Sequence, residues 1–160
     1  MPTLTLSEAR VLSVDDDVDA CEMLRILLKT EQIDVTCVQS AAAAWPKIKT
    51  ERFDLYLLDA WLPDIDGFEL CRQIRVNDPT TPILFYSGAA YNADKEKGIA
   101  AGANAYVTKP DVSGLMKTMV DLIAKAGAET LALSWMSTEC RVVGSWSMRL
   151  RPRPMSLIAN

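Results

Sequence analysis

One apolar run that ends on a carboxylate constrains the fold of this chain more than any other feature. Residues 53–67 read FDLYLLDAWLPDIDG. The four apolar residues 55–58 predict a strand buried on both faces, as in the middle of a parallel sheet. Asp59 follows at the carboxyl end of that strand, where open α/β sheets place their ligands, and Pro63 and Gly67 mark a loop behind it. We therefore expect Asp59 to lie at the centre of the functional site.

Strand and helix patterns alternate along the rest of the chain. Strands are predicted at residues 10–14, 33–37, 55–58, 82–87 and 105–108, and a helix is predicted after each of them. Apolar and polar residues alternate over 33–37, which is typical of a half-exposed strand at a sheet edge. Five β-α units in alternation predict an α/β fold, a doubly wound five-stranded parallel sheet with helices on both faces.

The helix boundaries show several capping residues and one disruptive proline. Four residues with capping side chains stand directly before predicted helices: Asp17, Ser40, Asp66 and Asp111. Pro46 lies inside the helix predicted at 40–50, so we expect it to kink that helix or to delay its start. Asp64 is expected only to be solvated in its loop. The last helix is predicted to run to about residue 126.

Histidine is absent from all 160 residues. Its absence excludes Ser-His and Cys-His nucleophile pairs, histidine metal sites and a phosphohistidine on this chain. Four cysteines lie far apart with no C-x-x-C pair, which is typical of small core residues in a reducing compartment. The N-terminus does not resemble a secretory signal, and no uncharged run approaches the ~18–20 apolar residues of a membrane span. We therefore expect a cytoplasmic protein.

Charge is divided unevenly along the chain. Residues 1–126 hold 13 Lys and Arg against 19 Asp and Glu, a net charge of −6, whereas residues 127–160 have a net charge of +2. The acidic part gives no reason for direct binding to nucleic acid or to an anionic membrane. We interpret residues 1–126 as one domain. We interpret residues 127–160 as a C-terminal tail, an extended helix or a disordered segment, with no recognisable output domain.

Polar side chains end four of the five predicted strands: Asp15 and Asp16, then Asp59, Ser87 and Lys109. Because parallel strands all point the same way, these side chains are expected to converge on one rim of the sheet. Three carboxylates and one ammonium leave a charge of about −2, which calls for a divalent cation. A ligand set made only of oxygen atoms suits Mg²⁺, with Mn²⁺ as an alternative.

These groups together can form an aspartyl phosphate. Asp59 is the expected nucleophile, because it lies beside the metal and lacks a competing partner. The metal and Lys109 would neutralise the charge on the phosphoryl oxygens, and Ser87 would donate a hydrogen bond to one of them.

Four motifs, in order and at fitting spacings, resemble those of response-regulator receiver domains, the phospho-accepting modules of two-component signalling. They are the acidic pair at 15–16, D-x-x-L-P-x-x-D-G at 59–67, Ser-Gly at 87–88 and G-A-x-x-Y-x-x-K-P at 102–110. The resemblance covers residues 10–126 and is strongest to stand-alone, chemotaxis-regulator-like receivers. It implies the flavodoxin-like receiver fold with strand order 2-1-3-4-5, in which residues 33–37 form an edge strand.

The resemblance also implies a role for each matching residue. It makes Asp59 the phospho-acceptor and, with Asp16, a side-chain ligand of Mg²⁺, to which Trp61 adds its backbone carbonyl. Asp15 would contact the ion, often through water. Lys109 would pair with the phosphate. Two further residues would form the switch: Ser87, which moves to bond the phosphate, and Tyr106, which turns inward behind it.

The resemblance implies partners of two kinds. A sensor histidine kinase or a phosphotransfer protein would supply the phosphoryl group. The output would be a partner protein, or a second copy of the chain, that binds the face built from the fourth helix, the fifth strand and the fifth helix. The function expected is that of a regulatory phospho-switch, with self-catalysed phosphoryl transfer and slow autodephosphorylation, rather than that of a metabolic enzyme.

Trp61 departs from the family by its bulk, two positions after the acceptor. With Ala89 it is predicted to lie where an attacking water would approach and so to slow hydrolysis of the acyl phosphate. Two alternatives to the leading interpretation stay open. One is a Mg²⁺-dependent phosphatase that uses the D-x-D formed by Asp15 and Asp17, and the other is a degenerate receiver that only binds.

Overall fold

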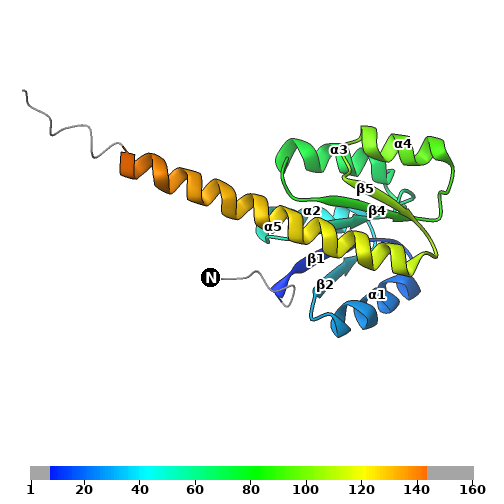
Figure 1. Cartoon of the computed structure of the whole chain (residues 1–160). Helices are drawn as coiled ribbons and strands as arrows, with labels where there is room; N and C mark the ends of the chain where they lie inside the picture. Colours follow the sequence, from blue (N-terminus) through cyan, green and yellow to red (C-terminus); the bar gives the residue numbers. More distant parts are fainter. Residues whose placement is uncertain (1–7, 144–160) are drawn as a thin grey trace, which may run out of the picture. The chain divides into compact units, whose positions relative to one another are not determined.

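A computed structural model of the protein describes residues 8–143, with side chains through residue 134. Five strands and five helices alternate in this part of the chain (Figure 1). The strands are β1 Arg10–Val14, β2 Asp34–Val38, β3 Leu55–Leu58, β4 Ile83–Ser87 and β5 Ala105–Thr108. The helices are α1 Val18–Thr30, α2 Ala41–Thr50, α3 Gly67–Asn77, α4 Asn92–Ala100 and α5 Val112–Val143.

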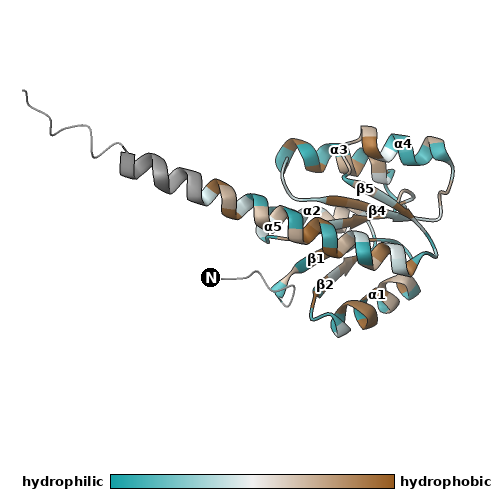
Figure 2. Ribbon diagram, in the orientation of Figure 1, coloured by the Kyte–Doolittle hydropathy of each residue, from teal (hydrophilic) through white to brown (hydrophobic). Residues whose placement is uncertain are grey.

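All strand pairs are parallel, and the sheet order is β2-β1-β3-β4-β5. This confirms the predicted doubly wound α/β fold and the edge position of β2. Side chains alternate between the two faces along each strand. Leu12 and Tyr56 pack in one core with residues of α2 and α3, whereas Val11 and Leu57 pack in the other with residues of α1 and α5 (Figure 2). The sheet therefore separates two hydrophobic cores, which fix the strands and hence the rim at their carboxyl ends.

The helix caps follow the sequence prediction, with one correction. Asp17, Ser40, Asp66 and Asp111 each accept a backbone N–H of the helix that follows. Asp64, expected only to be solvated, instead accepts the N–H groups of Ala41 and Ala42 at 3.1 and 2.8 Å. It thereby ties the loop after β3 to the first turn of α2.

Pro46 does not delay the start of α2, which begins directly after Ser40. The physical reason is that Ser40 and Asp64 together bind the first N–H groups of the helix, which otherwise lack partners. That support offsets the one backbone hydrogen bond that a proline removes.

Helix α5 continues to Val143 instead of ending near residue 126. One glycine, Gly127, costs a helix only about 1 kcal/mol, and four of the six residues at 128–133 are alanine or leucine, both strong helix formers. By its internal contacts the chain forms two compact units, Met1–Gly127 and Ala128–Asn160. Within the described residues, no helix combines the length and the apolarity needed to cross a bilayer.

The three cysteines described, Cys21, Cys37 and Cys71, are free thiols. Burial raises the pKa of the Cys21 thiol to about 12, and burial also raises the pKa of Cys71, to about 11. Such thiols are unreactive, which agrees with their interpretation as core residues. Cys140 lies outside the residues whose side chains are described.

Candidate phosphoryl-acceptor site

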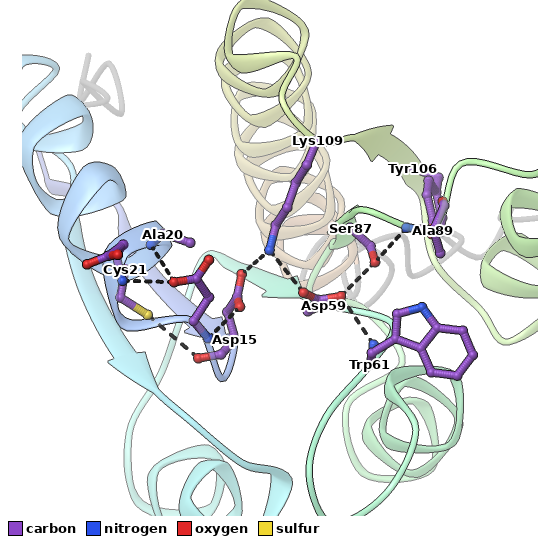
Figure 3. Close-up of polar contacts among 11 residues, drawn as sticks. Asp15, Ala20, Cys21, Asp59, Trp61, Ser87, Ala89, Tyr106 and Lys109 are labelled. Atoms are coloured by element: carbon purple, nitrogen blue, oxygen red, sulfur yellow. Dashed lines mark hydrogen bonds and ion pairs between the residues drawn. The ribbon is translucent and has the colours of Figure 1, made fainter.

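The predicted site residues that carry charge or a hydroxyl at the rim stand at or just after the carboxyl ends of strands, whereas Tyr106 lies within β5. Asp15 follows β1, Asp59 follows β3, Ser87 ends β4 and Lys109 follows β5. Asp15, Asp59 and Ser87 are buried, whereas Asp16 is exposed at the mouth of the site. The structure therefore brings together on one rim the residues that the sequence pattern assigned to it (Figure 3).

Lys109 bridges the two buried carboxylates. Its ammonium lies 2.6 Å from Asp15 Oδ2 and 2.9 Å from Asp59 Oδ2. Burial alone would lower the pKa of Lys109, but the two carboxylates outweigh it and hold that pKa above its ordinary value. Burial also raises the pKa of Asp15, and the hydrogen bond from Lys109 acts against that rise. Lys109 therefore remains a cation in the site at neutral pH.

The other carboxylate oxygen of Asp59 accepts two hydrogen bonds. The Ser87 hydroxyl donates to Asp59 Oδ1 at 2.6 Å, and the Trp61 backbone N–H donates to the same atom at 3.1 Å. These donors and Lys109 fix the plane of the carboxylate (Figure 3). The sequence argument missed this Trp61 N–H bond, although a residue two positions after a strand-ending Asp often makes such a turn.

A chain of hydrogen bonds links Asp59 to Tyr106. The Ala89 N–H donates to Ser87 Oγ at 3.3 Å, and the Tyr106 hydroxyl donates to the Ala89 carbonyl at 2.8 Å. Burial raises the pKa of Tyr106, so its hydroxyl is a neutral donor. Tyr106 therefore contacts the segment behind Ser87 through Ala89.

The loop after β3 is held close to the site by a glycine. A Cβ added at Gly67 would lie 1.9 Å from the Asp59 backbone carbonyl oxygen. The Gly67 N–H also donates to the Ala60 carbonyl at 2.8 Å. Position 67 therefore has room only for glycine, which has no side chain.

Three carboxylates form the only cluster of possible metal ligands among the described residues. One oxygen atom from each of Asp15, Asp16 and Asp59 lies within 4.8 Å of the others. Hard oxygen donors with a net negative charge fit a divalent cation such as Mg²⁺. Asp17, by contrast, is not part of this cluster, because its carboxylate caps α1 by accepting the N–H groups of Asp19 and Ala20.

The fold and the carboxylate rim define a class of protein: a doubly wound α/β domain with an acidic site at the carboxyl ends of its strands. The model of the response regulator receiver domain matches residues 11–121. The chain belongs to this family, whose members are regulatory domains of two-component systems.

Named relatives agree with this assignment. The chain is 37% identical over 101 residues to the cell cycle response regulators CtrA of Brucella ovis and of Brucella anthropi. The match covers 63% of this chain and 44% of each relative, so the chain spans less than half of the length of those proteins.

Solved structures agree as well. A CheY-like receiver domain protein from Methanospirillum hungatei is 29% identical, with a TM-score of 0.71, over 76% of this chain and 98% of that one. A putative response regulator from Chloroflexus aurantiacus is 32% identical, with a TM-score of 0.69, over 73% and 98% of the two chains.

Proposed function

We propose that the protein is a phosphorylation-activated switch that accepts a phosphoryl group on Asp59. One observation carries the proposal: the buried Asp59 carboxylate is held by Lys109, Ser87 and the Trp61 N–H beside two further carboxylates. A nucleophile, a fixed cation, a hydroxyl donor and an oxygen ligand set are together the requirements of phosphoryl transfer to a carboxylate.

The chain contains no histidine, so a phosphohistidine donor must lie on another protein, a sensor kinase or a phosphotransfer protein; a small acyl phosphate can also serve as donor. An oxygen of Asp59 attacks phosphorus, the P–N bond breaks, and the leaving imidazole nitrogen takes up a proton. Lys109 pairs with the developing charge, and Ser87 turns its hydroxyl from Asp59 to a phosphoryl oxygen. Mg²⁺ bound by Asp15, Asp16, Asp59 and the Trp61 carbonyl would supply further charge neutralisation.

The output is binding of a partner protein, or self-association, on the face formed by α4, β5 and α5 behind Tyr106. We propose that residues 1–126 form the receiver. The described free thiols fit a reducing compartment, which supports a cytoplasmic location. The proposal includes no direct contact with nucleic acid.

A Mg²⁺-dependent phosphatase that uses Asp15 and Asp17 receives less support. The Asp17 carboxylate is occupied by the first turn of α1, and Asp15 is paired with Lys109. Turnover of a phosphate monoester that survives Asp59→Asn would favour that alternative over the switch.

The test is incubation of the chain with a small acyl phosphate and Mg²⁺, with intact mass as the readout. We expect a single phosphoryl adduct, and we expect a chelator to reduce its formation to near background, because the three carboxylates repel a dianion when no cation is bound. Failure of acyl phosphates and of a panel of phosphohistidine donors to label the chain would instead support the degenerate receiver that only binds.

Trp61 should set the lifetime of the adduct. Trp61 is 64% exposed, and its backbone N–H binds Asp59, so we propose that its ring covers the side from which water would approach the acyl phosphate. We expect Trp61→Ala to shorten the phosphoryl half-life several-fold in a time course of intact mass, whereas Trp61→Phe, which keeps a ring, should fall between it and the wild type. An unchanged half-life in Trp61→Ala would show that the ring does not shield the acyl phosphate.

A further inference from the structure

A surface cavity of about 390 Å³ opens beside the acceptor site, between the start of α3 and α4. It is lined by Trp61, Asp66, Phe68, Arg72, Lys97 and Ala100. Its volume falls in the range of small ligand pockets and suits one bulky side chain with its neighbours. Apart from Trp61, none of these residues takes part in the phosphoryl transfer proposed above.

The cavity combines aromatic walls with positive charge. Trp61 presents its exposed ring, and Phe68 is buried in the core. Arg72 forms an ion pair with Glu69, with 2.9 Å between Arg72 Nη2 and Glu69 Oε2. Lys97 makes no ion pair with any carboxylate in the described part of the chain. The Asp66 carboxylate accepts the Glu69 N–H as the cap of α3 but keeps its negative charge, so the lining carries two cations against one carboxylate.

The lining of this cavity has a net formal charge of +1, from Arg72 and Lys97 against Asp66, whereas residues 1–126 as a whole have a net charge of −6. Charge complementarity therefore favours an acidic occupant. The end of this chain is a poor candidate, because residues 144–160 carry three arginines and no Asp or Glu.

The cavity is connected to the acceptor site by two routes. The Trp61 N–H binds Asp59, so the residue that forms a cavity wall also holds the nucleophile. The Phe68 ring lies 5.2 Å from that of Phe85, which in turn lies 5.5 Å from the ring of Tyr106. An occupant therefore contacts Trp61, which binds Asp59, and lies beside Phe68, which is joined to Tyr106 through the ring of Phe85.

We propose that the cavity between α3 and α4 is a docking site for an acidic segment of a partner protein, which inserts one bulky apolar side chain and places a carboxylate beside Lys97. The apolar side chain packs on the ring of Trp61, which removes exposed aromatic surface from water. The carboxylate pairs with Lys97 at the cavity edge.

The test uses N-acetylphenylalanine, which carries a ring and a carboxylate, and its uncharged amide as the comparison probe. Each probe is titrated into the ¹⁵N-labelled, unphosphorylated full chain, and the Trp61 indole N–H resonance is followed. For a probe of this size we expect a Kd on the order of 1 mM for the acid and several-fold weaker binding of the amide. Because no phosphoryl group is present, the result does not depend on the proposed function.

Charge reversal then locates the site. We expect Lys97→Glu to weaken binding of the acid several-fold, whereas Lys95→Glu, the same change two residues earlier on α4 and outside the cavity lining, should leave it unchanged. Equal effects of the two variants, equal affinity for acid and amide, or no shift of the Trp61 resonance would each overturn the proposal. Shifts that appear on concentrating the chain alone would assign the cavity to a second copy and would also overturn it.

Discussion

Replacing Asp59 with asparagine should abolish the phosphoryl adduct completely. Asparagine has the shape of aspartate and can keep the contacts with Ser87 and the Trp61 N–H. Its amide, however, is not a nucleophile toward phosphorus, and it removes one of the three clustered carboxylates. Intact mass after incubation with an acyl phosphate and Mg²⁺ should therefore show only the unmodified chain, at times when the wild type is largely modified.

Two further variants make this result specific. Asp16→Asn should slow the reaction without abolishing it, because it weakens the metal site and keeps the nucleophile. Asp19→Asn removes an exposed carboxylate of α1 that lies outside the cluster and should react like the wild type. An adduct of wild-type size on Asp59→Asn, formed at the wild-type rate, would place the acceptor elsewhere and contradict the assignment.

Gly67→Ala should produce the largest loss of stability of any single methyl addition near the site. The new Cβ would lie 1.9 Å from the Asp59 carbonyl oxygen, and this neighbour is backbone, which cannot rotate away. Overpacking of this kind costs about 1–3 kcal/mol or more. For a domain of this size that corresponds to a decrease in Tm of roughly 5–10 °C, measured by thermal unfolding. Relief of the clash moves Asp59, so phosphorylation should slow as well.

Gly88→Ala is the matched control for this prediction. A Cβ added at Gly88 meets no atom within 4 Å, although Gly88 directly follows Ser87 at the same rim. The same methyl group is thus added beside the same site without a clash, and the Tm should stay near that of the wild type. A Tm for Gly67→Ala equal to that for Gly88→Ala would show that the loop after β3 adjusts without cost.

The strand ends could be predicted from sequence because each has a strong local signal. The fully apolar residues 55–58 indicated an interior strand, and the alternation at 33–37 indicated an edge strand, whereas the full order of the sheet came from the resemblance to receiver domains. Once the strands are parallel, topology alone brings Asp15, Asp59 and Lys109 together. The ion pairs of Lys109 with Asp59 and Asp15, which are 50 and 94 positions away in the sequence, could therefore be predicted.

Contacts that depend on the exact path of a loop could not be predicted from the sequence. Asp64 appeared to be a solvated loop residue, and nothing local indicated that it caps α2, more than 20 residues earlier in the chain. The same contact explains why Pro46 does not delay the start of α2. The ring path from Phe68 to Tyr106 was equally hidden, because it joins three elements that only tertiary packing brings together.

Ala89 couples the conformations of the two switch side chains, Ser87 and Tyr106. It uses its N–H for Ser87 and its carbonyl for Tyr106, so one residue holds both switch side chains. Two side chains with two rotamers each would have four microstates if they were independent. Displacement of Ala89 disturbs both hydrogen bonds, so states in which only one of the two side chains has changed its rotamer become less populated. The ensemble is then expected to consist mainly of two states. NMR relaxation dispersion should then report one common exchange rate for residues 87–106, and two unrelated rates would contradict this coupling.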